Sequence, residues 1–326
     1  MAPIKNARVL FNSIPKDYPV PGESTVYDTT ETIDLDNHPL NGGFLVKTLV
    51  LSVDPYMRGR MKGSDVKSYI PGFVLGKPIT GFGVGVVLRS ENEDVPVGKH
   101  VYGIGFLHQE YFVLSNMSGF IFLEGKPGLP WSVYTGAAGM PGQTAYAGWK
   151  EYAYAKPGET ALVIQLAKRD GLKVIASAGS DEKVKFMRDI GADIAFNYKT
   201  TDTAEVLARE GPIDIYWDNV GGDVLDAALL HAAVYARFLV RYNTGHQGIK
   251  NLHQVYAMSL TMSGVSILRL AKYNEEFYAN VPRALAAGEF KYSEDVSHGL
   301  DKVGDVLLAV QTGANTGKAV VVVAEE

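Results

Sequence analysis

Hydrophobic and polar residues alternate along the first part of the chain, in short segments that Gly and Pro interrupt. Such segments occur at Gly43–Val53, Gly81–Leu88, Lys99–Tyr102 and Glu110–Val113. Alternation with a period of two is typical of strands, and many short strands separated by turn residues are typical of a sheet that rolls up. The pattern therefore predicts a β-rich, barrel-like domain at the start of the chain.

After Gly158 the pattern changes to strands that alternate with amphipathic helices. We expect strands at Lys173–Ser177, Ile194–Tyr198, Ile213–Asp218 and Arg237–Val240, and helices at Asp181–Ile190, Ala204–Glu210 and Val224–Ala233. In the first of these helices Val184, Met187 and Ile190 share one face. Regular alternation of this kind predicts a parallel, doubly wound sheet with helices on both faces.

The end of the chain holds one more helix and one more strand. The helix is expected at Ser297–Gln311 and the β-branched strand at Lys318–Val323. A terminal helix and strand can return to complete the first domain. We therefore predict a discontinuous β-rich domain (residues 1–126 and 289–326) around an α/β domain (residues 127–288), as the length of 326 residues also favours.

Composition excludes several classes of site. The chain has no cysteine, which excludes disulfides, a thiolate nucleophile and a zinc site built on sulfur. Its seven His residues show no ligand spacing, so no metal is expected. A net charge of −5 gives no electrostatic reason to bind nucleic acid or an anionic membrane. Without a signal core or an apolar run of membrane-spanning length, we expect a cytoplasmic protein.

A candidate nucleotide site lies where the strand Lys173–Ser177 leads into the next helix. NAD enzymes usually carry an acidic residue at this strand tip, whereas this chain has Ala178-Gly179-Ser180. Ser180 is a good N-cap, and Lys183 in the first helical turn can meet a 2′-phosphate. The strand end Asn197–Lys199 is a second candidate wall for that phosphate. The alternative is that Lys183 is a solvated helix lysine and Tyr198 an ordinary strand aromatic.

The first strand-to-helix turn of the α/β region departs from this layout. Dinucleotide folds need a glycine-rich turn there, so that the backbone can approach the pyrophosphate. No glycine occurs between Gly158 and Gly171. The segment Thr160–Val163 favours a strand and Ile164–Arg169 a helix end, with no turn residues between them.

Several motifs follow one another in order along nearly the whole chain. They are Val53–Arg58 (VDPYMR), Gly139–Tyr146 (GMPGQTAY), Gly179–Lys183 (GSDEK), Asn197–Lys199 (NYK), Asp218–Gly222 (DNVGG), Gly245–Asn251 (GHQGIKN) and Gly313–Val321 (GANTGKAVV). Each is weak alone, but the series is specific. It resembles the zinc-independent medium-chain dehydrogenases/reductases, in the branch of prostaglandin reductases and alkenal double-bond reductases. The resemblance implies a Rossmann-like cofactor domain and a GroES-like β domain.

The resemblance implies transfer of a hydride from NADPH to the β-carbon of an α,β-unsaturated aldehyde or ketone. The carbonyl oxygen then becomes an enolate oxygen, which needs a hydrogen-bond donor. In the family a Tyr followed by Asn supplies it, and the matching pair here is Tyr242-Asn243. The alternative for Tyr242 is a buried aromatic whose hydroxyl is satisfied within the protein.

The same resemblance assigns the remaining site residues. Lys183 and Tyr198, with the N-cap Ser180, would meet the 2′-phosphate, and Asn219 and Asn315 the rest of the coenzyme. Met140 and Thr144 would lie near the nicotinamide. Tyr56 and Arg58 would line the substrate entrance, although an interdomain ion pair is an equal alternative for Arg58. The implied partner is a small enal or enone, with a homodimer expected by analogy.

Two segments are shorter than the family pattern. The family has a turn resembling A-A-x-G-x-V-G after the strand at Leu162-Val163, and a strand end resembling C-G-x-I-S-x-Y-N before the tyrosine that matches Tyr242. Two alternatives to an active double-bond reductase therefore stay open: a member impaired in cofactor binding, and a quinone reductase of the same superfamily. The motifs Asp54–Arg58 and Tyr242-Asn243 argue against the quinone reductase.

Overall fold

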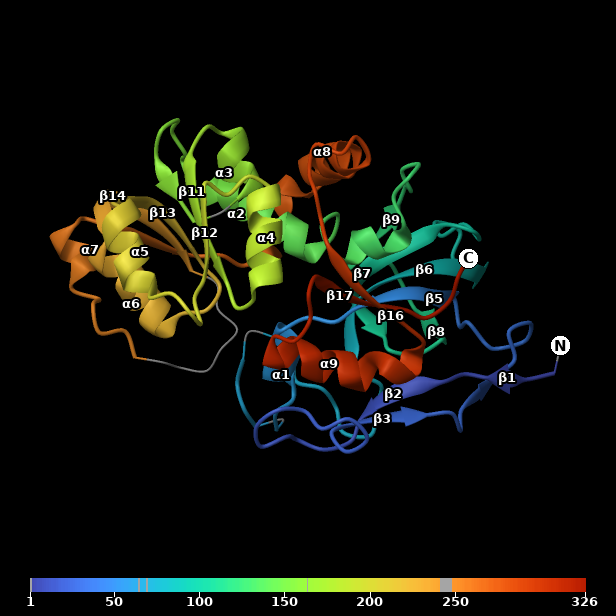
Figure 1. Ribbon diagram of the computed structural model, residues 1–326. Helices are drawn as coiled ribbons and strands as arrows, with labels where there is room; N and C mark the ends of the chain where they lie inside the picture. The colour runs from blue at the N-terminus through green and yellow to red at the C-terminus, as the bar shows by residue number, and fades with distance from the viewer. Residues whose placement is uncertain (1, 64, 69, 163, 241–247) are drawn as a thin grey trace. The chain divides into compact units, whose positions relative to one another are not determined.

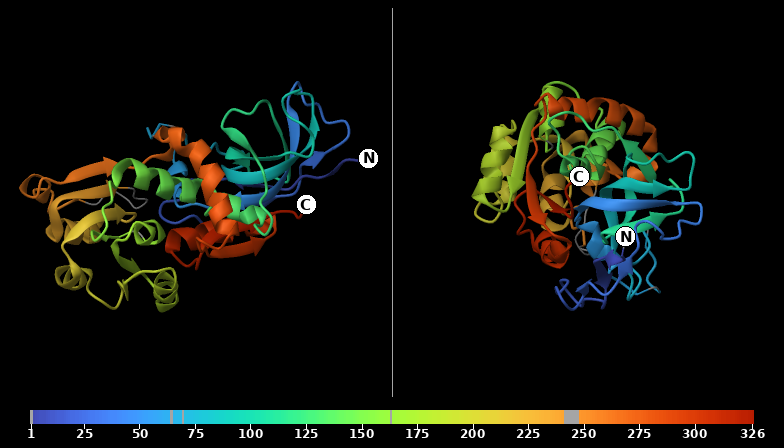
Figure 2. Two further views of the ribbon diagram at one scale, coloured as in Figure 1. Left: turned by 90° about the horizontal axis from the view of Figure 1, so that it is seen from above. Right: turned by 90° about the vertical axis from the view of Figure 1, so that its right-hand side faces the viewer.

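The computed structural model describes residues 2–63, 65–68, 70–162, 164–240 and 248–326. The chain divides into two compact units, which we call the first unit (Met1–Pro141 with Pro282–Glu326) and the second unit (Gly142–Val281). Both ends of the chain belong to the first unit, as the views in Figure 2 show. The chain passes between the units within α2 (Met140–Tyr152) and again within α8 (Asn274–Ala286).

The first unit is built mainly of strands. Its elements are β1 (Ile4–Lys5), β2 (Arg8–Phe11), β3 (Thr25–Asp28), β4 (Thr32–Ile33), β5 (Phe44–Ser52), α1 (Tyr56–Arg60), β6 (Thr80–Ser90), β7 (His100–Leu107), β8 (Tyr111–Leu114), β9 (Phe120–Leu123), the 3₁₀ turn η1 (Trp131–Thr135), β16 (Glu294–His298), η4 (Leu300–Lys302), α9 (Val303–Thr312) and β17 (Lys318–Val322). The main sheet runs in the order β16-β17-β5-β6-β7-β9, and β8 pairs with β5.

The end of the chain completes this sheet. Strand β17 pairs antiparallel with β5, with Val320 opposite Ser52 and Val322 opposite Val50. Helix α9 packs Val303 and Leu307 into the core, against a cluster that includes Phe106. This apolar burial stabilises the C-terminal segment on the first unit.

The second unit alternates strands and helices. Its elements after α2 are β10 (Thr160–Ala161), α3 (Gln165–Arg169), β11 (Lys173–Ala178), α4 (Asp181–Asp189), β12 (Ile194–Asn197), α5 (Thr203–Glu210), β13 (Ile213–Asp218), α6 (Gly222–Leu230), β14 (Ala232–Val240), α7 (Gln254–Ala257), β15 (Thr261–Gly264), η2 (Ile267–Arg269), η3 (Ala271–Tyr273) and α8. The sheet order is β12-β11-β10-β13-β14-β15, with parallel pairing throughout this path.

Alternate residues of these strands pack on opposite faces of the sheet. Tyr216 and Phe238 pack with α5 and α6, which lie on the same side of the sheet in Figure 1. Their neighbours Ile215 and Leu239 pack on the other face, with residues of α2, α3 and α4. A strand covered on both faces has to be apolar along its length. The predicted class, a doubly wound parallel sheet beside a β-rich domain, is confirmed.

Two predicted helices differ from the structure by more than one residue at an end. The predicted helix Val224–Ala233 ends at Leu230, and β14 begins at Ala232, with a local irregularity at Tyr235, whose φ is 65°. The predicted helix Ser297–Gln311 begins only at Val303. Residues Glu294–His298 instead pair with β17, and Gly299, with φ 96°, separates this strand from the helix.

Candidate functional site

The turn between β11 and α4 in the second unit leads into a capped helix start. Ser180 is the N-cap of α4, in an extended conformation, and its Oγ accepts a hydrogen bond from the Lys183 N–H at 3.4 Å. The Asn197 side chain donates to Asp181 at 2.9 Å, which ties the end of β12 to the first turn of α4. A capped helix start of this kind presents N–H groups and a positive partial charge to an anion.

The atoms around Gly179 explain why this turn has a glycine. A Cβ at Gly179 would lie 2.7 Å from the Tyr198 hydroxyl oxygen and 3.1 Å from Lys199 Cε. The side chains of Tyr198 and Lys199 therefore come over the Gly179 backbone, and Tyr198 remains 49% exposed. The structure thus brings Gly179, Ser180 and Tyr198 together. Lys199 joins them as a second cation, which the N-Y-K motif signals in the sequence.

The turn between β13 and α6 carries Asn219. Asp218, which is fully buried, accepts hydrogen bonds from the N–H groups of Gly221 at 2.9 Å and Val220 at 3.3 Å. The hydroxyl of Tyr216 lies 3.3 Å from the same carboxylate oxygen, and burial, followed by the Asp218 charge, raises the pKa of Tyr216 so that it stays a donor. Asp218 was not predicted as a site residue, yet it shapes the turn.

The side chain of Asn219 at this turn accepts a hydrogen bond from Trp217 Nε1 at 3.2 Å. It lies on the exposed side of the turn, at the carboxyl end of β13. Thr144 is also in the second unit, on α2, where it is buried. These two residues and the β11–α4 turn are therefore carried by one compact unit, which is the arrangement a nucleotide-binding edge of a doubly wound sheet requires.

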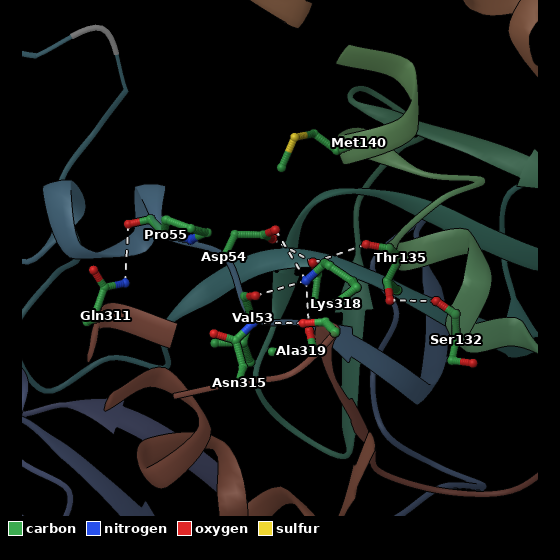
Figure 3. A network of polar contacts seen from close by, with 12 residues as sticks. Val53, Asp54, Pro55, Ser132, Thr135, Met140, Gln311, Asn315, Lys318 and Ala319 are labelled. Carbon is green, nitrogen blue, oxygen red and sulfur yellow. Dashed lines mark hydrogen bonds and ion pairs between the residues drawn. The ribbon is translucent and has the colours of Figure 1, made fainter. Parts of the chain in front are cut away.

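Met140 and Asn315 belong to the first unit. The backbone N–H of Met140 donates to the Tyr102 hydroxyl at 2.7 Å. Asn315 lies in the loop before β17 and donates to the Gly317 carbonyl at 2.7 Å. In the view of Figure 3 they lie on either side of a polar network around Lys318. The structure brings the loop of Asn315 against the segment that precedes α1.

Tyr56 and Arg58 lie on α1 in the first unit. The ring of Tyr56 packs edge-on against Phe82. Arg58 donates to the carbonyls of Asp17 at 2.7 Å and Pro15 at 3.3 Å. Arg58 thus bonds to backbone carbonyls of its own unit and fixes the 15–17 loop beside α1.

Tyr242, the predicted catalytic residue, lies outside the described residues, as does its neighbour Asn243. Within the described part of the chain, no group of three or more His, Cys, Asp or Glu side chains could hold a metal ion. No helix among these residues is long and apolar enough to cross a membrane.

The chain matches two known protein families. Residues 10–121 match the family described as the N-terminal domain of oxidoreductase, and residues 161–286 match the family described as zinc-binding dehydrogenase. The NADP(+)-dependent 2-alkenal reductase of Nicotiana tabacum is 36% identical, over 99% of each chain. The (+)-pulegone reductase of Mentha piperita is 36% identical, over 88% of this chain and 89% of that protein.

A solved structure, CurA from Vibrio vulnificus in complex with NADPH, has the same fold with a TM-score of 0.87 and 29% identity, over 98% of this chain and 100% of that one. Similarity of this extent includes both units rather than one shared domain. The sequence has no cysteine to build a thiolate zinc site. The chain belongs to the zinc-independent medium-chain dehydrogenase/reductase family.

Proposed function

We propose that this protein uses NADPH to reduce the carbon–carbon double bond of α,β-unsaturated aldehydes and ketones. The observation that carries the proposal is the β11–α4 turn, where Gly179 lets the Tyr198 and Lys199 side chains lie directly over the backbone that leads into the capped helix α4. The relatives at 36% identity named above, which reduce an alkenal and pulegone, support the same substrate class.

The residues at this turn fit a phosphorylated coenzyme. Gly179 lets Tyr198 and Lys199 approach the backbone, Ser180 caps the helix, and β11 itself ends in Ala178 without an acidic residue. Asp181, in the first turn of α4, is bonded by the Asn197 side chain. Lys183, Tyr198 and Ser180 would hold that phosphate, with Lys199 as a second cation. Asn219 and Asn315 would contact the rest of the coenzyme, and Met140 and Thr144 would lie near the nicotinamide. When bound, NADPH supplies the hydride.

The substrate step follows from the charge that develops. As the β-carbon gains a hydride, the electron pair of the double bond moves toward the carbonyl, whose oxygen becomes negative. In the proposal Tyr242 donates a hydrogen bond to this oxygen, and the α-carbon then takes a proton to give the saturated product. Tyr56 and Arg58 would line the entrance, where the bonds from Arg58 to Asp17 and Pro15 keep α1 in place.

The alternative of a member impaired in cofactor binding has one observation in its favour. Strand β10 covers only Thr160–Ala161, and the next helix, α3, has five residues. Thermal unfolding with and without NADPH separates the two hypotheses, because a bound ligand stabilises the folded state by mass action. A quinone reductase is the weaker alternative, since relatives at 36% identity reduce carbon–carbon double bonds.

The test is oxidation of NADPH on addition of a simple enal or enone, followed by the absorbance of the reduced nicotinamide. Replacing Tyr242→Phe should lower turnover ~10-fold to 1,000-fold, with NADPH binding nearly unchanged. Tyr235→Phe is the matched control, because Tyr235 is 71% exposed in the same unit. A folded wild-type protein that turns over none of these substrates contradicts the proposal, and an unchanged rate in Tyr242→Phe removes this residue from catalysis.

The homodimer and the cytoplasmic location also belong to the proposal. Both come from the sequence and from analogy with the family. Sedimentation of the purified protein tests the dimer directly, and a monomer at all concentrations would contradict it.

A further inference from the structure

Lys318 is a lysine whose ammonium is enclosed by the protein. It opens β17, and its side chain is only 17% exposed, beside Asp54 at 2%. The Nζ atom lies 2.8 Å from the Val53 carbonyl, 2.7 Å from the Ala319 carbonyl and 3.3 Å from Asp54 Oδ1 (Figure 3). An ammonium has three N–H donors, and here three oxygens surround it. The geometry is that of a fully satisfied buried cation.

The residues around Lys318 hold its ammonium group in place. Burial lowers the pKa of Lys318, and the carboxylates of Asp54 and Glu294 oppose that shift. Asp54 in turn accepts a hydrogen bond from the Ser52 hydroxyl at 2.5 Å. Removing one member of such a pair leaves the other buried and unpaired, which is costly. The side chain of Lys318 is therefore fixed by its surroundings.

Lys318 lies just beyond the end of the pairing between β17 and β5, while it still pairs with Glu294 of β16. The described ladder between β17 and β5 stops with Val320 opposite Ser52. Beyond it, the contacts between the two segments include the Val53 N–H to the Ala319 carbonyl at 3.3 Å and Gln311 Nε2 to the Pro55 carbonyl, also at 3.3 Å. The two segments are residues 53–55 and residues 311–319. The Lys318 ammonium, which belongs to the second segment, bonds to Val53 and Asp54 of the first. The strands are already paired without it, so its contribution is to the segments past the sheet edge.

These two segments carry residues of both candidate sites in the first unit. Asn315, the proposed coenzyme contact, lies three positions before Lys318 in the loop that closes with its bond to Gly317. Tyr56, the proposed substrate contact, begins α1 two positions after Asp54. A shift of either segment would move one contact relative to the other, and small misplacements at a reacting centre are costly.

We propose that Lys318 is a positioning residue, which holds the loop of Asn315 and the start of α1 in fixed register through Asp54 and the Val53 and Ala319 carbonyls. This inference rests on the proposed function, because that proposal assigns Asn315 and Tyr56 their contacts. Lys318 acts through Asn315 and does not itself contact the coenzyme.

A double-mutant cycle on NADPH binding tests the proposal. The affinity for NADPH is measured by equilibrium titration in the wild type, Lys318→Met, Asn315→Ala and the double variant. Each single change should weaken NADPH binding ~10-fold, and the double variant should lose little more than either one, because coupled residues are not additive. Lys318→Arg keeps a cation with several donors but in a larger, planar group, so it should restore part of the affinity that Lys318→Met loses.

A second set of variants separates positioning from stability. Asp54→Asn with Lys318→Met removes both charges, so its thermal unfolding midpoint should recover toward the wild type while NADPH binding stays weakened. Lys302→Met is the matched control, because Lys302 forms an exposed pair with Asp301 in the same unit. Its affinity for NADPH should not change.

Two outcomes would overturn the positioning role. One is additive effects of Lys318→Met and Asn315→Ala, and the other is recovery of both stability and NADPH affinity in the doubly neutral variant. A wild type that binds NADPH but reduces no enone contradicts the proposed function alone, since the cycle measures binding. A wild type that binds no NADPH overturns both.

Discussion

Two strand-to-helix turns at neighbouring strands of the second unit differ in almost every respect. After β11 the chain has Gly179, the capping Ser180 and a helix of nine residues. After β10 it has no glycine before Gly171, and α3 has five residues. Among the described residues no side chain caps the start of α3 at Ile164. Both turns follow the carboxyl ends of parallel strands, where dinucleotide folds bind phosphates.

The contacts around β10 stabilise the fold. Arg237 donates to both carboxylate oxygens of Glu159, at 2.9 and 2.6 Å, and the Thr160 N–H donates to Asp214 at 2.8 Å. The Leu162 N–H bonds to the Ile215 carbonyl at 3.0 Å. These charged contacts lie at the start of β10, whereas the β11–α4 turn has a capping serine and a glycine over which Tyr198 and Lys199 lie. From the capped turn after β11 we propose that the coenzyme is held mainly from its 2′-phosphate end.

The largest expected effect is at Lys183. Lys183→Ala should weaken NADPH binding ~30-fold to 100-fold and leave NADH binding nearly unchanged, because only NADPH carries the 2′-phosphate. Lys185→Ala is the matched control: Lys185 is 77% exposed on the same helix and pairs with Asp189. Equal losses for the two coenzymes, measured by titration, would contradict the phosphate assignment.

The next effect concerns the ion pair between Arg237 and Glu159 at the start of β10. Arg237→Met should lower the free energy of unfolding by about 1.5–3 kcal/mol, the range for charged hydrogen bonds, with a much smaller effect on NADPH affinity than Lys183→Ala. Denaturant titration measures the first quantity. If Arg237→Met weakened NADPH binding more than Lys183→Ala does, the region around β10, and not the β11–α4 turn, would carry the coenzyme.

The ion pair between Arg237 and Glu159 also predicts how the stability of the fold depends on pH. Burial raises the pKa of Glu159, but the hydrogen bonds from Arg237 and Lys156 outweigh it, so the pKa of the folded state is lowered. A lowered pKa stabilises the fold above the ordinary glutamate range, and that stability is lost as the pH falls through the lowered value. Glu159→Gln should therefore flatten the acid side of the stability profile, and an unchanged profile would remove the pair from this role.

A smaller effect is expected at Gly179. Gly179→Ala places a Cβ 2.7 Å from the Tyr198 hydroxyl, so the tyrosine has to move, and NADPH binding should weaken ~3-fold to 10-fold. Gly264→Ala is the control, since no atom lies within 4 Å of a Cβ there. Tighter binding in Gly179→Ala would mean that Tyr198 is not part of the phosphate site.

The sequence predicted what depends on local periodicity. The strand and helix alternation gave the parallel sheet, and the apolar run at the C-terminus gave the strand that pairs with β5. The capping serine and the glycine at the β11–α4 turn were also recognisable, because cap and turn chemistry is local. The boundary at Gly299 was missed, because the pairing of Glu294–His298 with β17 overrides a helical pattern.

Contacts between residues far apart in the chain could not be predicted from the sequence pattern. Lys318 begins an apolar strand and would ordinarily be expected in solvent, but its carbonyl partner Val53 lies 265 positions away. Asp218 resembles any acidic residue at a strand end, and only the fold shows its carboxylate beneath the Val220 and Gly221 N–H groups. Partners of this kind are set by topology, which no local period encodes.

Whether the coenzyme is held from its 2′-phosphate end can be tested on the wild-type protein in one competition titration. NADPH should bind at least ~100-fold more tightly than NADH. Adenosine 2′,5′-bisphosphate should displace NADPH, with a dissociation constant within ~10-fold of that of NADPH. Equal affinity for NADPH and NADH, with no displacement by the bisphosphate, would contradict this mode of binding.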